Sequence, residues 1–304
     1  MTFKFSVVIP LYNKEKHIER AIRSVLNQAL SVDEIIVVDD GSIDNGAKVV
    51  EKLACEKILL IRQLNQGVSV ARNTGIKACR NELILLLDAD DIWLPHFTTE
   101  ITKLVTLFPD AGMFATAYAF LTEEKIIPAT LKGCPNETGI IADYFLSCIK
   151  ADLPITASSV AIKKSLIMEI GGFSSGMKMG EDQLLWSRIA YKHSIAYSVK
   201  ISVYYDKSIE NSACKVNLIT HMAPHIQFWE QDLKLNRVPL HLHNSLIQLM
   251  HFSALYCVKN NLKLNNKKQA RYLLFNEPNL KRDIYWFISI FLTFIPLFII
   301  KRIL

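Results

Sequence analysis

Residues 83–95 read LILLLDADDIWLP, an apolar run that ends in three aspartates at positions 88, 90 and 91. A continuous apolar run bounded by turn residues is typical of a strand that is covered on both faces of a sheet. Carboxylates this close repel one another, so they need a cation, hydrogen-bonding partners or open water. The stretch therefore predicts a buried strand whose carboxyl end carries either a charged site or an acidic turn.

The residues before this stretch alternate between strand and helix patterns. Apolar runs such as EIIVV read as buried strands, and the segments between the runs repeat apolar residues at helical spacing. This alternation predicts right-handed βαβ units, a parallel sheet and an α/β fold. The strands are expected over 3–9, 34–38, 57–62 and 82–87, and the helices over 13–28 (with Asn13 as N-cap), 44–54 and 68–79.

Polar clusters follow three of these strands. They are Tyr12–Asn13, Asp39–Asp40 and Asp88–Asp91. In open α/β sheets, ligands bind beyond the carboxyl ends of the strands. We therefore expect the three clusters to share one crevice.

The remaining chain is expected to complete an α/β domain over 1–212 and to continue as a helical, basic extension over 213–282. An apolar segment over 283–304 follows. The short strands are expected over 112–121, 158–162, 195–199 and 201–205, and the helices over 163–170, 181–191, 217–231, 240–259 and 264–275.

The apolar segment contains IYWFISIFLTFIPLFII, 17 uncharged residues at 284–300. As a helix they would extend about 26 Å, a little less than the roughly 30 Å of a bilayer core. A spanning helix, an in-plane or re-entrant anchor and a buried or oligomer-forming helix all stay open. The aromatics, and seven Lys or Arg against one Glu over 259–282, favour contact with an anionic membrane surface.

Bulk composition excludes several classes of protein. Half of the residues are apolar and 21% are charged, which is globular rather than disordered. Six scattered cysteines without a CxxC pair suggest reduced thiols and give no support for zinc. The first residues lead directly into a strand, so no secretory leader is expected. No nucleic-acid partner is expected, because the Lys and Arg residues cluster beside the apolar segment and no aromatic residues alternate with them.

Several residues after the strands could carry chemistry. Asp88 and Asp90 could converge on Mg²⁺ or Mn²⁺, or could form an acidic turn. Asp39 and Asp40 could accept hydrogen bonds from a nucleobase or ribose, or could belong to an ordinary turn. Arg72 could pair with phosphate, with one of the aspartates, or in a surface ion pair.

Two acids, Glu181 and Asp182, open a predicted helix after a glycine-rich loop. Acids in a first turn complement the helix dipole. A carboxylate beside a flexible loop is also well placed to act as a general base.

Five motifs in this order resemble family 2 glycosyltransferases, which have the GT-A fold. The resemblance covers residues 4–205, and it makes 1–212 a GT-A domain with a Rossmann-like, mostly parallel sheet and flanking helices. It implies an inverting transferase that uses a nucleotide-diphosphate sugar and Mn²⁺ or Mg²⁺. The motifs are SVVIPLYN, EIIVVDDGSIDNG, NQGVSVARNTGI, LLLDADDIWLP and GGFSSGMKMGEDQLLW.

The same resemblance implies roles for individual residues. Asp182, the second acid of the ED pair, would be the catalytic base. Asp90 would bind the metal, and Asp88 would face the ribose and the metal. The remaining substrate-binding residues would be Pro10, Tyr12, Asp39, Asp40, Arg72 and Glu181, with Asp40 accepting from the base and Arg72 near the pyrophosphate or nucleoside.

Two motifs of family members are missing. A Gln-x-x-Arg-Trp motif, found in processive members, is absent, so one sugar per encounter is expected. Many relatives carry a histidine after the later strands, whereas 204–214 contain none; Asp206 or Lys207 could take its place.

The expected donor is a UDP-sugar, and the expected acceptor is a glycan or lipid-linked precursor of a bacterial surface polysaccharide. The expected location is the cytoplasmic face of the cell membrane. Two alternatives are a catalytically inactive sugar-nucleotide-binding or scaffold subunit and a sugar-phosphate nucleotidyltransferase. The second would need a glycine-rich basic loop after the first strand, which reads IPLYNKEKH instead.

Overall fold

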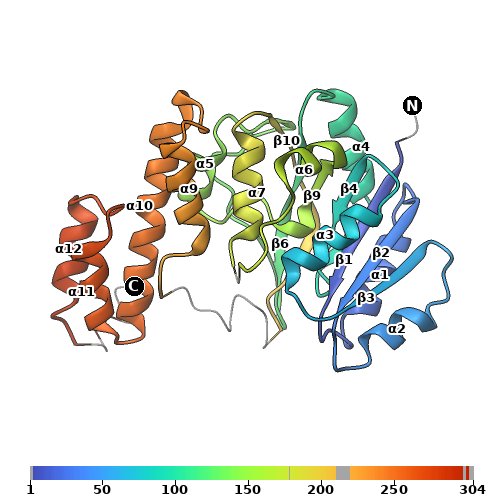
Figure 1. Ribbon diagram of the computed structural model, residues 1–304, viewed down its shortest axis with the longest axis horizontal. Coiled ribbons are helices and arrows are strands. Elements are labelled where there is room, and N and C mark those ends of the chain that lie inside the picture. The colour runs from blue at the N-terminus through green and yellow to red at the C-terminus, as the bar shows by residue number, and fades with distance from the viewer. Residues whose placement is uncertain (1–2, 178, 210–219, 297–298, 301–304) are drawn as a thin grey trace. The chain divides into compact units, whose positions relative to one another are not determined.

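The computed structural model describes residues 3–177, 179–209, 220–296 and 299–300. The chain divides into two compact units, Met1–Glu210 and Asn211–Leu304 (Figure 1). The expected end of the first domain at 212 lies outside the described residues. The three-part division of the chain therefore stays a prediction.

The first unit is built on one sheet with the strand order β3-β2-β1-β4-β9-β6-β10-β5. The pairs β1–β2, β2–β3, β1–β4 and β6–β10 are parallel, and the other pairs are antiparallel. The sheet is therefore mixed, because β9 pairs antiparallel with both β4 and β6, but four of the seven pairs along this strand order are parallel, as expected for a mostly parallel sheet. The main strands are β1 (Phe5–Leu11), β2 (Glu34–Asp40), β3 (Ile58–Gln63), β4 (Leu83–Leu86), β5 (Ile92–Trp93), β6 (Met113–Leu121), β9 (Val160–Lys163) and β10 (Ile195–Asp206).

The four expected N-terminal strands are confirmed, together with the three helices between them. These helices are α1 (Ile18–Leu26), α2 (Gly46–Lys52) and α3 (Val68–Ala78). The N-cap prediction for Asn13 is wrong, because α1 begins at Ile18. Asn13 has a φ of 52°, a left-handed conformation that asparagine tolerates, and its side chain accepts a hydrogen bond from the Ile43 amide.

Side chains of β1 alternate between two covered faces of the sheet. Val7 and Ile9 belong to the core that also holds buried side chains of α1 and of α4 (Phe97–Leu107). Val8 faces α3 instead, where a Cβ on Gly75 would approach Val8 Cγ1 to 2.4 Å. Burial on both faces explains why the strand reads as a continuous apolar run.

The later part of the first unit differs from the sequence expectation in several elements. Helix α4 was not predicted, although Phe97, Ile101 and Leu104 are buried at helical spacing. The two strands expected over 195–199 and 201–205 are one strand, β10, with irregular register between Ser198 and Val203. The expected β6, β9, α6 (Lys164–Ile170) and α7 (Glu181–Ala190) are present; β7 (Ile126–Pro128), β8 (Gly139–Ile140) and α5 (Tyr144–Lys150) were not predicted.

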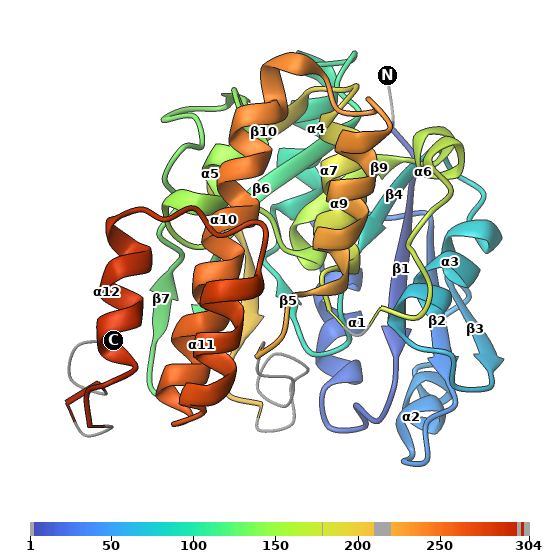
Figure 2. The same cartoon turned by 60° about the vertical axis from the view of Figure 1, so that its left-hand side comes forward.

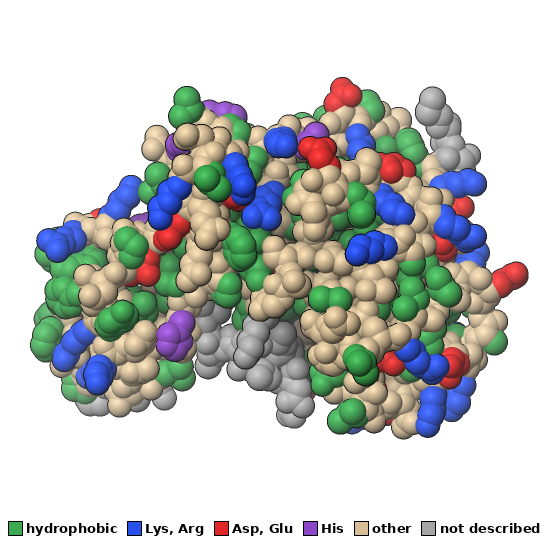
Figure 3. Space-filling model, in the orientation of Figure 1, with side chains coloured by type: hydrophobic (Ala, Val, Ile, Leu, Met, Phe, Trp, Pro, Cys, Tyr) green, Lys and Arg blue, Asp and Glu red, His purple; other side chains and the backbone are tan. Residues whose placement is uncertain are grey.

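The second unit is helical, as expected. Helices α10, α11 and α12 lie side by side in Figures 1 and 2 and share a small buried core around Trp286. Hydrophobic side chains also lie on its surface over α11 and α12 (Figure 3). No helix among the described residues is long and apolar enough to cross a membrane. The helices are α9 (Pro224–Lys234), α10 (Leu240–Lys263), α11 (Lys267–Asn276) and α12 (Ile284–Leu292).

Candidate active site

The three polar clusters lie at one edge of the sheet, as expected. In the parallel pair of β1 and β2, Leu11 is level with Asp39, and β4 continues on the other side of β1 toward Asp88. In the strand order β3-β2-β1-β4, the chain continues from β1 to β2 on one side and returns to β4 on the other side of β1. The strand order therefore reverses direction at β1. Open α/β sheets bind ligands at such switch points.

Asp39 and Asp40 are buried and hold the loops of this edge. Asp40 Oδ1 accepts from Gln63 Nε2 at 2.7 Å and from the Gln66 amide at 3.0 Å, and its Oδ2 accepts from the Gly67 amide at 2.8 Å. A carboxylate has about four acceptor positions, so roughly one stays available to a ligand. The role of Asp40 toward a nucleobase stays a prediction.

Tyr12 presents an open aromatic surface at the end of β1. Its side chain is 48% exposed, and the neighbouring Asn13 amide donates to Ser42 Oγ at 3.1 Å. Pro10 lies just before it, half-buried in β1. The exposed ring has the surface that a planar base needs for stacking.

Arg72 connects two carboxylates from distant parts of the chain. Its Nη2 lies 2.7 Å from Asp88 Oδ1 and its Nη1 lies 2.8 Å from Glu181 Oε1, while its side chain is only 4% exposed. Burial lowers the pKa of Arg72, but the charges of Asp88 and Glu181 more than offset this and raise it. Of the roles open to Arg72, the structure shows pairing with an aspartate; contact with a pyrophosphate stays a prediction.

The aspartates of DADD divide into one buried group and two accessible ones. Asp91 is buried and accepts from Ser158 Oγ and from the Asp206 amide. Burial, together with the charges of Asp90 and Asp88, raises its pKa well above the ordinary value. Asp91 therefore anchors the turn, which the sequence did not distinguish from its neighbours.

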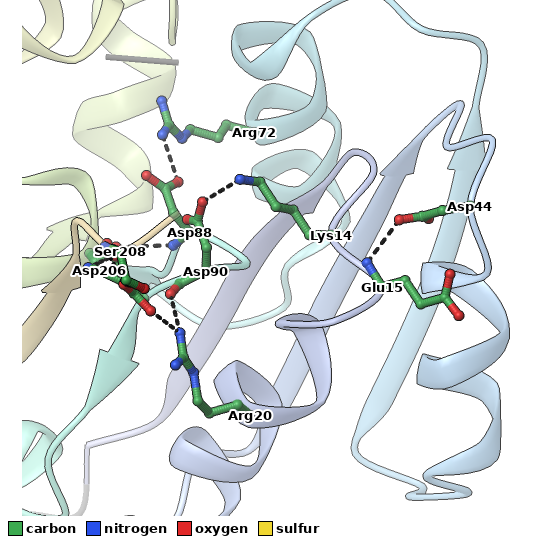
Figure 4. Close-up of polar contacts among 11 residues, drawn as sticks. Lys14, Glu15, Arg20, Asp44, Arg72, Asp88, Asp90, Asp206 and Ser208 are labelled. Atoms are coloured by element: carbon green, nitrogen blue, oxygen red, sulfur yellow. Dashed lines mark hydrogen bonds and ion pairs between the residues drawn. The ribbon is translucent and has the colours of Figure 1, made fainter. Parts of the chain in front are cut away.

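Asp88 and Asp90 remain reachable, with side chains 30% and 20% exposed. Figure 4 shows Arg72 pointing at Asp88 and Lys14 pointing at Asp90 from the other side. Lys14 Nζ lies 2.6 Å from Asp90 Oδ2. Lys14 was not predicted as a site residue, although its place two residues after Tyr12 was a usable signal.

The donor set at Asp88 and Asp90 fits a hard divalent cation. In the described part of the chain, no group of three or more His, Cys, Asp or Glu is arranged to hold a metal. Mg²⁺ is usually held by one or two carboxylates together with substrate phosphates, so two accessible carboxylates are sufficient. Lys14 and Arg72 supply the positive charge that balances these carboxylates in the structure.

Arg20 closes the lower side of the DADD turn (Figure 4). Its Nη2 donates to the Asp90 carbonyl at 2.8 Å and to Asp206 Oδ2 at 2.5 Å. Burial would raise the pKa of Asp206, but hydrogen bonds from Ser208 and Arg20 hold it below its usual value. Asp206 thus fastens β10 to this turn.

Asp182 is the second residue of α7, whose N-cap residue Gly180 has a φ of 83°. Its Oδ1 accepts from the Gln183 amide at 2.7 Å. Burial, followed by the neighbouring charge of Glu181, raises the pKa of Asp182 to about 7. A carboxylate with this pKa is a far stronger base than a solvated aspartate, and about half of it is ionised at neutral pH.

The sequence and the fold were compared with those of known proteins. The sequence model described as glycosyl transferase family 2 matches residues 6–149. An uncharacterized glycosyltransferase of Nostoc sp. is 44% identical over 108 residues, 34% of this chain and 33% of the relative. The amylovoran biosynthesis glycosyltransferase AmsE of Erwinia amylovora is 28% identical over 190 residues, 61% of this chain and 69% of AmsE.

Two solved structures share the architecture. S. aureus TarS 1–349 in complex with UDP-GlcNAc has a TM-score of 0.61 at 18% identity, over 89% of this chain and 87% of TarS 1–349. The mannosyltransferase PcManGT of Pyrobaculum calidifontis, in complex with GDP-Man and Mn²⁺, has a TM-score of 0.60 at 17% identity. The match covers 94% of this chain and 78% of PcManGT. At these identities the likeness shows the fold alone.

The mixed sheet is that of a GT-A-like α/β fold, and residues 6–149, a little less than half of the chain, belong to glycosyl transferase family 2. The chain's matched segments span about a third or less of the Nostoc relative and of EpsJ of Bacillus subtilis.

Proposed function

We propose that this chain transfers one sugar, with inversion, from a nucleotide-diphosphate sugar to a hydroxyl of a glycan or lipid-linked acceptor. The observation that carries the proposal is the chain of contacts from Asp88 through Arg72 to Glu181, beside Asp182 with its raised pKa. These contacts connect Asp88, which would face the ribose and the metal, to Glu181, the neighbour of the proposed base Asp182.

Inverting transfer needs a base on one face of the anomeric carbon and a stabilised diphosphate on the other. Asp182 would accept the proton of the acceptor hydroxyl as that oxygen bonds to the sugar. Arg72 would hold the carboxylates of Asp88 and Glu181 in place, one at each of its terminal nitrogens. Mn²⁺ or Mg²⁺ held by Asp90 and Asp88 would supply charge stabilisation to the diphosphate leaving group.

The proposed donor is a UDP-sugar. TarS 1–349 was solved with UDP-GlcNAc and PcManGT with GDP-Man and Mn²⁺, which supports a nucleotide-sugar donor without choosing the base. Tyr12, Pro10, Asp39 and Asp40 would form the nucleoside pocket, with Tyr12 stacking on the base.

The proposed process is the synthesis of a bacterial surface polysaccharide on a lipid-linked precursor, at the cytoplasmic face of the cell membrane. The name of the relative AmsE, an amylovoran biosynthesis glycosyltransferase, supports the polysaccharide part. The aromatic and basic C-terminal region supports the membrane part.

A thermal-shift screen of nucleotides with and without Mn²⁺ tests the proposal. A ligand that binds only the folded protein raises the melting temperature. We expect UDP to stabilise the protein only with Mn²⁺, and Asp90→Ala to abolish the shift. If a different nucleoside diphosphate shifts the melt, the donor assignment is wrong. If none does, the enzyme proposal fails.

Binding alone would also fit an inactive nucleotide-sugar-binding subunit. Metal-dependent hydrolysis of the bound UDP-sugar separates the two functions, because it needs a working site. Hydrolysis that Asp182→Asn removes supports the transferase, whereas strong binding without any turnover supports the inactive subunit.

A further inference from the structure

Helix α12 is fixed on the second unit by its inner face. Trp286 and Leu292 are buried, and Trp286 Nε1 donates to the Leu274 carbonyl of α11 at 2.7 Å. Asp283 caps the helix by accepting from the Trp286 amide at 3.0 Å. The orientation of α12 on α11 is therefore set by specific contacts.

The outer face of α12 is apolar and exposed. Four of its side chains and Phe294, which follows the helix, continue one helical spacing and are between 46% and 71% exposed. Single exposed apolar residues are ordinary, whereas a contiguous set marks an interaction surface. We call this set the outer face; it consists of Ile284, Phe287, Ile288, Phe291 and Phe294.

Aromatic side chains of α11 extend this surface. Tyr272 and Phe275 are 60% and 63% exposed. The Phe275 ring lies edge-on to Trp286, with 5.8 Å between ring centroids. The space-filling view shows hydrophobic and basic side chains together over α11 and α12 (Figure 3).

Basic side chains border the outer face at both ends. Lys281 and Arg282 precede α12 and are exposed, and the Arg282 guanidinium lies 5.7 Å from the Trp286 ring centroid. At the other end, the Arg271 guanidinium lies 4.6 Å from the Phe294 ring, and Arg271 Nη2 donates to the Thr293 carbonyl at 3.2 Å. Cations therefore border the aromatic surface at both ends, whereas the acid at the start of α12, Asp283, is already engaged by the Trp286 amide and His251.

We propose that the outer face of α12 is a membrane-docking surface that lies in the plane of an anionic leaflet. Its apolar side chains would enter the boundary between headgroups and acyl chains, and Arg271, Lys281 and Arg282 would contact lipid phosphates. This chemistry is typical of interfacial helices, which combine exposed aromatics with bordering bases. The inference rests on the membrane location in the proposed function and names the lipid and the contact surface.

A second copy of the chain is a less suitable occupant. Two outer faces brought together would also bring their basic borders together, and like charges repel. An anionic lipid surface complements both the apolar face and its border.

Vesicle flotation tests the inference on the full chain. The vesicles are phosphatidylcholine with and without phosphatidylglycerol, at low and at high salt. Phe287→Ser combined with Phe291→Ser should weaken binding to the anionic vesicles about a hundredfold, since two large apolar side chains lose their burial. Leu240→Ser is the matched control, because Leu240 is 85% exposed in the same unit but lies on α10; it should bind like the parent.

A second variant tests the charges separately. Lys281→Gln combined with Arg282→Gln should weaken binding about fivefold for each charge removed and flatten its salt dependence. The nucleotide-dependent thermal shift should persist in both variants, which separates this inference from the proposed enzyme activity. Unchanged flotation of both variants would overturn the inference. So would equal binding to neutral vesicles, or a dimer in solution that the Phe287 and Phe291 changes dissociate.

Discussion

At the scale of single residues, the environment of Asp182 determines the chemistry that we propose. An ordinary solvated aspartate is a weak base, whereas burial beside Glu181 raises the pKa of Asp182 to about 7. Asp182→Asn should lower turnover by about 10²–10⁴-fold and leave donor binding unchanged. Single-turnover rates and nucleotide titrations measure the two effects. Comparable turnover in the variant would remove Asp182 from this role.

The same pKa predicts a pH dependence with a definite sign. The base acts when it is ionised, so kcat/KM should rise with pH up to about 7 and then level off. Below that pH, kcat/KM should fall about tenfold for each pH unit, because the ionised fraction of Asp182 falls tenfold. A profile without this acid limb in the parent protein would contradict the assignment of Asp182 as the group with the raised pKa.

Lys14 competes for the carboxylate that we assign to the metal. The Lys14–Asp90 ion pair is partly exposed, and such pairs contribute about 1 kcal/mol. Lys14→Ala should therefore tighten Mn²⁺ binding about fivefold in the absence of nucleotide, as measured by calorimetric titration. Lys16→Ala, an exposed change nearby, is the control and should leave the affinity unchanged. Weaker Mn²⁺ binding in Lys14→Ala would place the metal elsewhere.

At the scale of elements, Arg72 joins α3 to α7 and to the end of β4. Arg72→Gln removes the cation between the buried Glu181 and the partly exposed Asp88 and should cost about 3 kcal/mol of unfolding free energy in urea. Since the charge of Arg72 lowers the pKa of Asp182, the acid limb should also move to higher pH. Arg62→Gln breaks an exposed ion pair with Glu51 and should cost less than about 1 kcal/mol. If the acid limb of the kcat/KM profile lies at the same pH in Arg72→Gln as in the parent, Arg72 has only a structural role.

Helix α3 packs closely on β1 through Gly75. Because an added Cβ would lie 2.4 Å from Val8 Cγ1, Gly75→Ala should destabilise the protein by about 1–3 kcal/mol despite the better helix propensity of alanine. Lys77→Ala, at an exposed position of the same helix, should change the stability by less than about 0.5 kcal/mol. Urea unfolding of the two variants measures the difference, and equal midpoints would contradict the close packing.

Strands with continuous apolar runs were predictable, and short exposed strands were not. The continuous apolar runs of β1, β2 and β4 gave a clear signal, because both faces of these strands are covered. The short strands β7 and β8 have mostly exposed side chains, so burial left no pattern in their sequence. The predicted N-cap at Asn13 is wrong because the Asn13 side chain accepts a hydrogen bond from the amide of Ile43, 30 residues later, instead of capping a helix.

At the scale of the whole molecule, the chain consists of two compact units with separate hydrophobic cores. A chain that ends at residue 209 should therefore unfold cooperatively and keep its metal-dependent nucleotide shift, because the candidate site lies within the first unit. It should lose binding to anionic vesicles. Thermal unfolding and flotation measure these properties. A non-cooperative melt would show that the first unit depends on the second.

The sequence by itself determined the strands and helices from β1 to β4 and the presence of polar clusters after three strands. Those properties are local, since burial imposes a period on neighbouring residues. Only the tertiary structure decided that Arg72 binds Asp88 and Glu181, that Lys14 binds Asp90, and that Asp91 is buried beneath them. These contacts join residues up to 109 positions apart, as in the Arg72–Glu181 pair. Their partners follow from sheet order and helix packing, which bring distant side chains together in ways that no local pattern records.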